Sequence, residues 1–271
     1  MNMKKMLSLA LAGVMALSLM ACSAQNGGDS SENTASLGGD VTSQPESEPQ
    51  NTETREAVTI TSLNANKEAA ELEVPYDPQR IAILDMASLD ILNALGVGDR
   101  VVGTASTSLE YLQDYINDDI ANLGTIKEAD LEAVMACEPD VIFIGGRLSS
   151  SYDALSEIAP VVYLATDTEL GVVESVRQNA TTIASMFGLE DKVDELMADF
   201  DARITALQAV SEGQTAIVGM CTSGSFNVLG NDGRCSIIGV EVGFENIGVD
   251  ANIDTSTHGN EASFEFIVDK N

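Results

Sequence analysis

The sequence predicts an α/β protein made of two βα lobes joined by a long helical bridge, with the second lobe incomplete. Three observations predict this class. Short apolar runs without polar alternation, such as 81–84 and 141–144, end in polar or glycine loops and precede helical patterns, as in βα units of a parallel sheet. The forty residues from about 171 to 210 have helical periodicity and no strand. Strand character then resumes at Thr215.

Residues 1–21 have the pattern of a secretory leader, with Lys4-Lys5 before an apolar core at 6–20. The leader ends in LMAC, which resembles the bacterial lipobox and implies cleavage before Cys22 and lipid attachment to its sulfur. The alternative is an ordinary leader with an incidental cysteine. Residues 22–56 are polar and aperiodic, so we expect a disordered tether after the lipidated cysteine.

We assign residues 57–170 to the first lobe. Weak alternation over 58–74 predicts an entry hairpin with its turn near 64–66. Four buried strands are expected from the apolar runs 81–84, 101–103, 141–144 and 161–164. A helix follows the first of these strands and ends at Gly96.

The stretch 123–160 is the most informative unit of this lobe. Asp130 is a good helix N-cap, and the glutamate-proline pair at 138–139 ends the helix that it starts. The buried strand 141–144 ends at two glycines, and Arg147 comes directly after them. Because ligands of open α/β sheets bind beyond the carboxyl ends of the strands, Arg147 is placed where a ligand would lie.

Residues 171–210 form the predicted bridge, as two helices interrupted at Gly188. The alternative is a crossover helix pair within one sheet. Residues 211–271 form the second lobe, with a turn at 231–234 that ends in Arg234 and a helix at 236–242. We expect this lobe to be incomplete, because the pattern at 130–134 recurs at 263–267 and the chain stops where the first copy continues into a buried strand.

The charge balance argues against nucleic acid as a partner and makes each cation near a strand end informative. The net charge is −30, from 43 acidic and 13 basic residues, so nucleic acid is not expected as a partner. Any anionic ligand must be held by local cations against this field. A cation at a strand end is therefore more informative here than in a neutral protein.

Cysteine and histidine usage predicts no metal site. Four cysteines without CxxC spacing and one histidine, His258, do not form a zinc cluster. Cys137, Cys221 and Cys235 are interpreted as small buried apolar residues, with a disulfide between the last two as the alternative.

The order of parts resembles substrate-binding lipoproteins of ABC importers in the iron-siderophore and vitamin B12 group, and most resembles the ferric catecholate siderophore binders of Gram-positive bacteria. Three stretches carry the likeness: PQRIAILDMASLDILNALGV, LGTIKEADLEAVMACEPDVIFIGGR and HGNEASFEFIVDKN. The resemblance covers essentially all of 57–271. It implies the helical-backbone periplasmic-binding fold, with two Rossmann-like lobes and the ligand in the cleft between them.

The resemblance also implies which residues bind the ligand. Lys127, Arg147 and Arg234 match cationic cleft positions, and His258 is added as a candidate that could also be purely structural. A ferric tris-catecholate is a trianion with an aromatic rim, which suits planar guanidinium donors. The alternative for each cation is a solvated surface position. Where some relatives have an iron-ligating histidine, the nearest residue here is Gly239, so the resemblance leaves open whether the protein ligates iron directly.

The implied partners follow from the same likeness. Glu132 and Glu265 are expected to dock on arginines of an ABC permease that works with its ATPase, although acids in a first helical turn are also favoured by the helix dipole alone. We expect a monomer with no resident cofactor, held by its lipid anchor on the extracytoplasmic face of the cell membrane.

Other functions remain as alternatives. A haem or a corrinoid is the second ligand candidate, and a non-functional fragment is the third interpretation. An enzyme is not expected, because the sequence has no GxSxG, HExxH or strand-following GxGxxG motif. A single histidine also leaves little equipment for acid–base chemistry.

Overall fold

The computed structural model describes residues 56–167, 170–222, 224–231, 235–248 and 259–270 of the chain. All of them belong to one compact unit, Thr52–Asn271. The predicted leader, the lipidation site Cys22 and nearly all of the predicted tether lie outside the described residues, as do Arg234 and His258.

The chain enters the fold through the predicted hairpin. Strands β1 (Ala57–Leu63) and β2 (Ala69–Pro75) pair antiparallel, with Ala57 opposite Pro75. The side-chain oxygen of Asn64 accepts hydrogen bonds from the backbone amides of Asn66 and Glu68, at 2.9 and 3.0 Å. This Asx-type turn fixes the hairpin register, as expected for asparagine at such a position.

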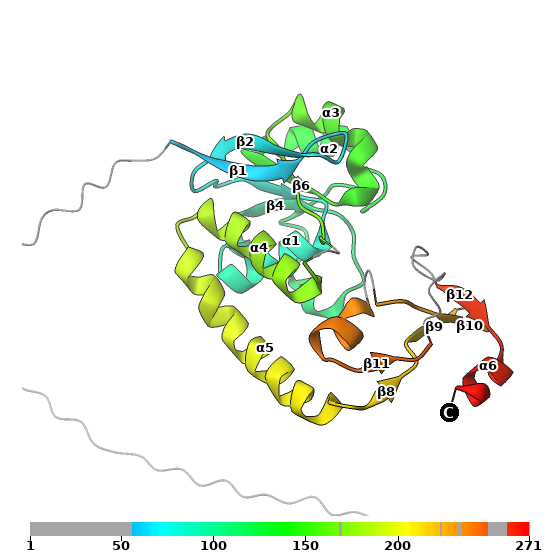
Figure 1. Cartoon of the computed structure of the whole chain (residues 1–271). Coiled ribbons are helices and arrows are strands. Elements are labelled where there is room, and N and C mark those ends of the chain that lie inside the picture. The colour runs from blue at the N-terminus through cyan, green and yellow to red at the C-terminus, as the bar shows by residue number, and fades with distance from the viewer. Residues whose placement is uncertain (1–55, 168–169, 223, 232–234, 249–258, 271) are drawn as a thin grey trace, which may run out of the picture. The chain divides into compact units, whose positions relative to one another are not determined.

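A five-stranded parallel sheet forms the centre of the first lobe (Figure 1), in the order β5-β4-β3-β6-β7. Its strands are β3 (Ile81–Ile83), β4 (Val101–Thr104), β5 (Ala121–Asn122), β6 (Val141–Ile144) and β7 (Val161–Tyr163). Every residue of β3 and β6 is fully buried. The four apolar runs are thus confirmed as strands, all of whose residues are buried except Val102 of β4, and β5 is an addition that we did not predict.

Helices α1 (Met86–Leu95), α2 (Leu131–Ala136) and α3 (Tyr152–Ser156) connect these strands. The Asp85 carboxylate caps α1 by accepting from the backbone N–H of Ser88, and Gly96 ends the helix in the left-handed region at φ 76°. The Asp130 carboxylate caps α2 by accepting from the N–H of Ala133 at 3.0 Å. The predicted cap at Asp130 and the predicted helix end at Gly96 are therefore confirmed, whereas the Asp85 cap was not predicted.

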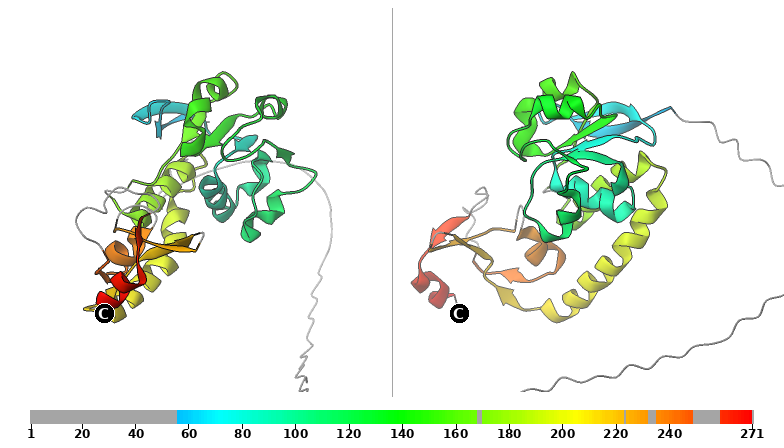
Figure 2. Two further views of the ribbon diagram at one scale, coloured as in Figure 1. Left: turned by 90° about the vertical axis from the view of Figure 1, so that its right-hand side faces the viewer. Right: turned by 180° about the vertical axis from the view of Figure 1, so that it is seen from behind.

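The bridge is an antiparallel helix pair, α4 (Val172–Ser185) and α5 (Glu190–Ser211), which the two views of Figure 2 show from the side and from behind. Gly188 connects them at φ 66°, and a Cβ there would lie 2.5 Å from the Tyr76 hydroxyl. The Arg177 guanidinium holds the helices together by donating to both carboxylate oxygens of Asp201 at 2.8 Å. The next strand joins a different sheet, so the crossover alternative is wrong.

The second lobe contains two small sheets. Strand β8 (Thr215–Ala216) pairs parallel with β11 (Glu245–Asn246). Strands β9 (Gly219–Thr222), β10 (Ser225–Val228) and β12 (Asn260–Ala262) form an antiparallel sheet with β10 in the centre. A short helical turn spans Ile237–Glu241, and α6 spans Phe264–Asp269. The strand at 215 and the helical turn were predicted, whereas the β9–β10 hairpin was not.

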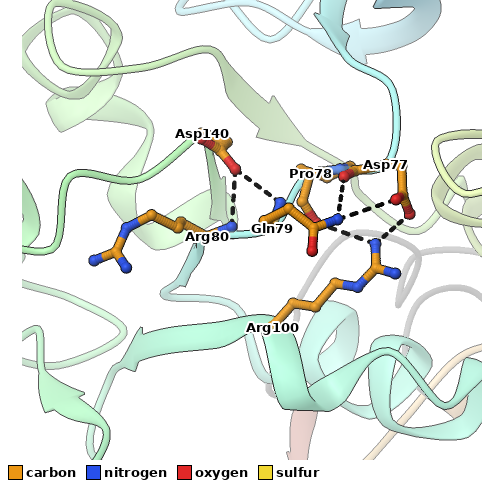
Figure 3. A network of polar contacts seen from close by, with 6 residues as sticks. All are labelled: Asp77, Pro78, Gln79, Arg80, Arg100 and Asp140. Carbon is orange, nitrogen blue, oxygen red and sulfur yellow. Dashed lines mark hydrogen bonds and ion pairs between the residues drawn. The ribbon is translucent and has the colours of Figure 1, made fainter. Parts of the chain in front are cut away.

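Two arginines outside the candidate site, Arg80 and Arg100, have structural roles. The Arg80 guanidinium donates from Nε to the backbone oxygens of Cys137 and Glu138, at 3.0 Å each, and so satisfies carbonyl groups at the C-terminal end of α2. The backbone N–H groups of Gln79 and Arg80 donate to the Asp140 carboxylate at 2.7 and 2.9 Å (Figure 3). These contacts align the start of β3 with the start of β6.

Arg100 is the second structural arginine. It pairs with the Asp77 carboxylate (Figure 3), and its guanidinium lies over the Phe187 ring at 5.3 Å from the centroid. Phe187 belongs to the connection between α4 and α5, so Arg100 ties the first lobe to the bridge.

All three cysteines in the described part of the chain are free, and Cys137 is buried while Cys221 is exposed. The buried-apolar interpretation therefore holds for Cys137 and is wrong for Cys221, whose short strand β9 leaves it at the surface. None of the helices in the described residues has both the length and the apolar character needed to cross a bilayer.

Candidate functional site

The candidate site lies at the carboxyl edge of the parallel sheet, where the loops after β3, β4, β6 and β7 begin. These loops start at Leu84, Ala105, Gly145 and Leu164. Parallel strands present all their carboxyl ends at one edge, and this is where ligands of such sheets bind. A hollow of about 230 Å³ opens at this edge beside β4 and β5, lined largely by polar residues that include Ser106 and Asn122.

Arg147 is presented by the loop after β6. It belongs to a 3-10 turn, Gly146–Ser151, which is anchored by the fully buried Leu148. Its side chain is exposed, and the guanidinium makes no hydrogen bond or ion pair with any residue that the structure describes. The turn is therefore fixed by Leu148, while the charge of Arg147 is available for an anion.

The two glycines before Arg147 allow close approach at the same edge. A Cβ at position 145 would lie 2.7 Å from Oδ1 of Asp85, and one at position 146 would lie 3.1 Å from the Tyr163 hydroxyl. The other Asp85 oxygen accepts from both the backbone N–H and the hydroxyl of Ser88, at 2.9 and 2.8 Å. The loops after β3 and β6 are thus packed directly against each other.

Asp85 lies beside the Arg147 loop and was not predicted as a residue of the site. Its signal was present in the sequence, since an acidic residue directly follows a buried strand and precedes Ser88 by three positions. The carboxylate contributes negative charge next to the Arg147 loop.

Lys127 lies on a tight turn that is bonded to the loop after β4. Both the backbone N–H and the hydroxyl of Ser106 donate to the carbonyl of Gly124, at 2.9 and 3.0 Å. The Thr125 hydroxyl accepts from the N–H groups of Lys127 and Glu128, at 3.2 and 3.1 Å. The Lys127 side chain is exposed and has no partner within the described ranges. The structure thus ties Lys127 to the edge that also carries Arg147.

The second-lobe candidates lie outside the described residues, so a hollow shared by Arg147, Arg234 and His258 stays a prediction. Gly239 is a second-lobe position that the structure does describe. A Cβ at position 239 would lie 2.5 Å from the side-chain oxygen of Asn231. Position 239 therefore faces Asn231, whose side chain would have to move to admit any residue larger than glycine.

Glu132 and Glu265 occupy equivalent positions in the first turns of α2 and α6, which begin with the same sequence pattern. Each is exposed in the first turn, and each helix is capped by the side chain of the residue two positions earlier, Asp130 or Ser263. The pKa of Glu265 is lowered because its carboxylate accepts hydrogen bonds from its own backbone N–H and from Ser263. Glu265 therefore stays ionised at neutral pH and presents negative charge to any partner.

The described residues offer no arrangement that would ligate a metal through protein side chains. No group of three or more histidine, cysteine, aspartate or glutamate side chains among them is placed to hold an ion. Burial raises the pKa of the Tyr163 phenol beside Gly146, so this group stays protonated near pH 7. The site as described can hold an anion through charge and hydrogen bonds.

Comparison with known proteins gives consistent matches. The family model for "Periplasmic binding protein" matches residues 81–271. The petrobactin-binding protein YclQ of Bacillus subtilis is 35% identical over 202 residues, which cover 73% of this chain. The ferric-anguibactin-binding protein FatB of Vibrio anguillarum is 29% identical, over 72% of this chain. This chain spans 63% of YclQ and 61% of FatB.

Solved structures match in the same way. The crystal structure of YclQ superimposes with a TM-score of 0.71 at 33% identity, covering 80% of this chain and 75% of that one. The catecholate-siderophore binding protein VctP of Vibrio cholerae superimposes with a TM-score of 0.70 at 27% identity, covering 79% and 76% of the two chains.

Proposed function

This chain belongs to the periplasmic binding protein family, and we propose that it is a receptor that binds a ferric siderophore, of the catecholate class, for uptake by an ABC importer. Two relatives by sequence are named for petrobactin and ferric anguibactin, and a structural relative is named for catecholate siderophores. The protein performs no covalent chemistry in this proposal, and the iron chelate is its cargo rather than a cofactor.

The observation that carries the proposal is the position of Arg147. Its guanidinium is exposed and without a partner in the described part of the chain, directly beyond the carboxyl end of a fully buried parallel strand. Arg203, by contrast, is paired with Asp199 on the exposed face of α5. An anion is the ligand that this arrangement suits.

The strongly acidic composition does not prevent binding of an anion. Electrostatic interactions in physiological salt are screened over about 8 Å, so acids far from the carboxyl edge contribute little at Arg147. Lys127 and Arg147 act locally, and we propose that Arg234 and His258 complete the site from the second lobe. The guanidinium groups would both offset the charge of the trianionic chelate and stack on its aromatic rings.

Delivery to a membrane permease is the second part of the proposal. Glu132 and Glu265 support it, because they are exposed acids at equivalent positions of two similar helix starts. Two such acids suit a permease with two-fold symmetry and basic docking positions. We propose that the receptor acts as a monomer in this step and that the ATPase of the importer drives transfer.

We propose that the receptor is attached to the extracytoplasmic face of the cell membrane through lipid on Cys22, with residues up to about 56 as a tether. The LMAC sequence supports this proposal. Mass spectrometry of the amino-terminal peptide is expected to show acyl chains on Cys22. A Cys22→Ser variant is expected to appear in the medium, and its continued attachment to membranes would contradict the anchor.

Titration with ferric siderophores tests the binding proposal. The chain has five tyrosines and no tryptophan, so tyrosine fluorescence is the intrinsic signal. Ferric catecholates, ferric hydroxamates, ferric citrate, haem and a corrinoid are added separately. We expect saturable quenching by a ferric catecholate at micromolar concentration or below. Binding of haem or the corrinoid alone would overturn the siderophore assignment.

A further inference from the structure

The beginning of helix α4 is capped by a residue that lies far away in the sequence. Gly171, at the N-cap position of α4, provides no side-chain hydrogen bond to the first turn. Instead, Oε1 of Glu241 accepts a hydrogen bond from the backbone N–H of Val173 at 3.0 Å. Glu241 ends the helical turn of the second lobe, so one carboxylate connects that lobe to the bridge. We call this contact the Glu241 cap.

The local structure leaves room for this carboxylate. Gly171 has φ 82°, and a Cβ there would lie 2.8 Å from Oε1 of Glu241. A glycine is therefore required by both the backbone conformation and the space. A negative charge at this place also interacts favourably with the N-terminus of a helix of fourteen residues.

Glu241 is held from the other helix of the bridge as well. The side-chain amide of Gln208, near the end of α5, donates to the backbone oxygen of Glu241 at 2.8 Å. The hydroxyl of Ser211, the last residue of α5, donates to the backbone oxygen of Val242. Residues 241–242 thus join the first turn of α4 to the last turns of α5.

The second oxygen of the Glu241 carboxylate shows that this contact is not optimised for stability alone. Oε2 is buried and has no hydrogen-bond partner among the residues that the structure describes. A buried polar atom without a partner costs free energy, and such an atom in a native fold calls for an explanation. A role in holding the helical turn of the second lobe against α4 and α5 would explain why this cost is kept.

We propose that Glu241 is a positioning residue for the ligand site, and this inference rests on the proposed function. The loop that precedes α4 starts at the carboxyl edge of the first-lobe sheet, beside the Arg147 loop. Through Val173 of α4 and Gln208 of α5, the Glu241 cap fixes the helical turn of the second lobe against both helices of the bridge. It therefore holds the two lobes in one arrangement before the ligand arrives, which raises affinity by pre-organisation.

Two variants and one matched control test this inference. Glu241→Ala removes the acceptor, and Glu241→Gln retains an oxygen for Val173. Glu174→Ala is the control, because Glu174 carries the same charge in the same first turn of α4 but pairs only with Arg177. If the binding-competent fraction falls to about a tenth without the cap, the apparent Kd for the ferric catecholate rises about tenfold.

The measurements are siderophore titration and amide hydrogen exchange of the peptide that contains Val173. We expect Glu241→Ala to lose protection at Val173 and to bind about tenfold more weakly, with Glu241→Gln and Glu174→Ala within about twofold of wild type. Where Glu241→Ala does not fold, Glu241→Asp replaces it, since its shorter side chain does not reach Val173.

The outcomes separate the cap from the proposed function. Equal protection of the Val173 amide from hydrogen exchange in wild type and in Glu241→Ala, or in Glu241→Asp where that replaces it, would overturn the Glu241 cap. Lost protection with an unchanged Kd would overturn the positioning role. If wild type binds no ferric siderophore, the proposed function fails and the positioning role fails with it, while hydrogen exchange still decides whether the cap exists.

Discussion

Ser62 offers a direct test of how the edge of the first-lobe sheet is closed. β7 is an edge strand, and its outer side faces β1 rather than another strand of the sheet. The backbone N–H of Tyr163 donates to the Ser62 hydroxyl at 2.9 Å, and the same hydroxyl lies 3.4 Å from the carbonyl oxygen of Tyr163. One side chain therefore takes the place of a neighbouring strand.

The Ser62→Ala variant removes this partner inside the protein. Ser62 and Tyr163 are each 3% exposed, so water does not replace the lost hydroxyl without rearrangement. A buried N–H left unsatisfied costs about 1–3 kcal/mol. For a domain of this size each kcal/mol lowers the Tm by roughly 2–4 °C.

Urea unfolding followed by circular dichroism measures the loss. Ser108→Ala is the matched control, because it makes the same substitution at an exposed position and is expected to change stability by less than about 0.5 kcal/mol. A loss below about 0.5 kcal/mol for Ser62→Ala as well would refute the argument, since the hydroxyl would then not satisfy the strand edge.

Three further predictions concern other parts of the fold. Gly188→Ala is expected to destabilise the protein by more than about 1 kcal/mol in thermal unfolding, because the position has positive φ and its Cβ would meet the Tyr76 hydroxyl; an unchanged Tm would show that the α4–α5 connection adapts. Burial raises the pKa of the Cys137 thiol and shields it, whereas Cys221 is exposed. In the native protein we therefore expect a thiol reagent to label Cys221, and to label Cys137 only after unfolding; rapid labelling of both would contradict the buried position. Desolvation of its carboxyl also raises the pKa of Asp90, so its charge opposes folding above that pKa and the penalty disappears as pH falls. Because Asp90 is exposed, Asp90→Asn is expected to be only slightly stabilising at pH 7, with the difference vanishing in acid; a larger gain in acid than at pH 7 would contradict this.

The sequence predicted those elements whose signal is local. Four of the five strands of the parallel sheet were visible as apolar runs, because a strand covered on both faces has no polar alternation. β5 was missed because it has only two residues, Ala121 and Asn122, and exists through pairing with β4. The β9–β10 hairpin was missed because its residues are only partly buried and lack a clear apolar pattern.

The residues of the candidate site were likewise predictable only where their signal is local in the sequence. Arg147 was predicted from its position after a strand and two glycines, which is a local pattern. Glu241 was missed, because its partner Val173 is 68 positions away in the sequence and nothing near Glu241 indicates the contact. Asp85 falls between these cases, since its helix cap was recognisable locally but its contact with Gly145 depends on the neighbouring strand.

The measurement that tests the central claim most directly is the Kd of a ferric catecholate for Arg147→Ala, compared with Arg203→Ala and wild type. Arg203 is the matched control because its side chain is 74% exposed on α5 and pairs with Asp199. Removing one charge-assisted contact of about 1.5–3 kcal/mol is expected to weaken binding by roughly tenfold to a hundredfold in Arg147→Ala, with Arg203→Ala unchanged. Equal affinities for all three proteins would contradict the claim that the carboxyl edge of the first-lobe sheet holds the ligand through Arg147.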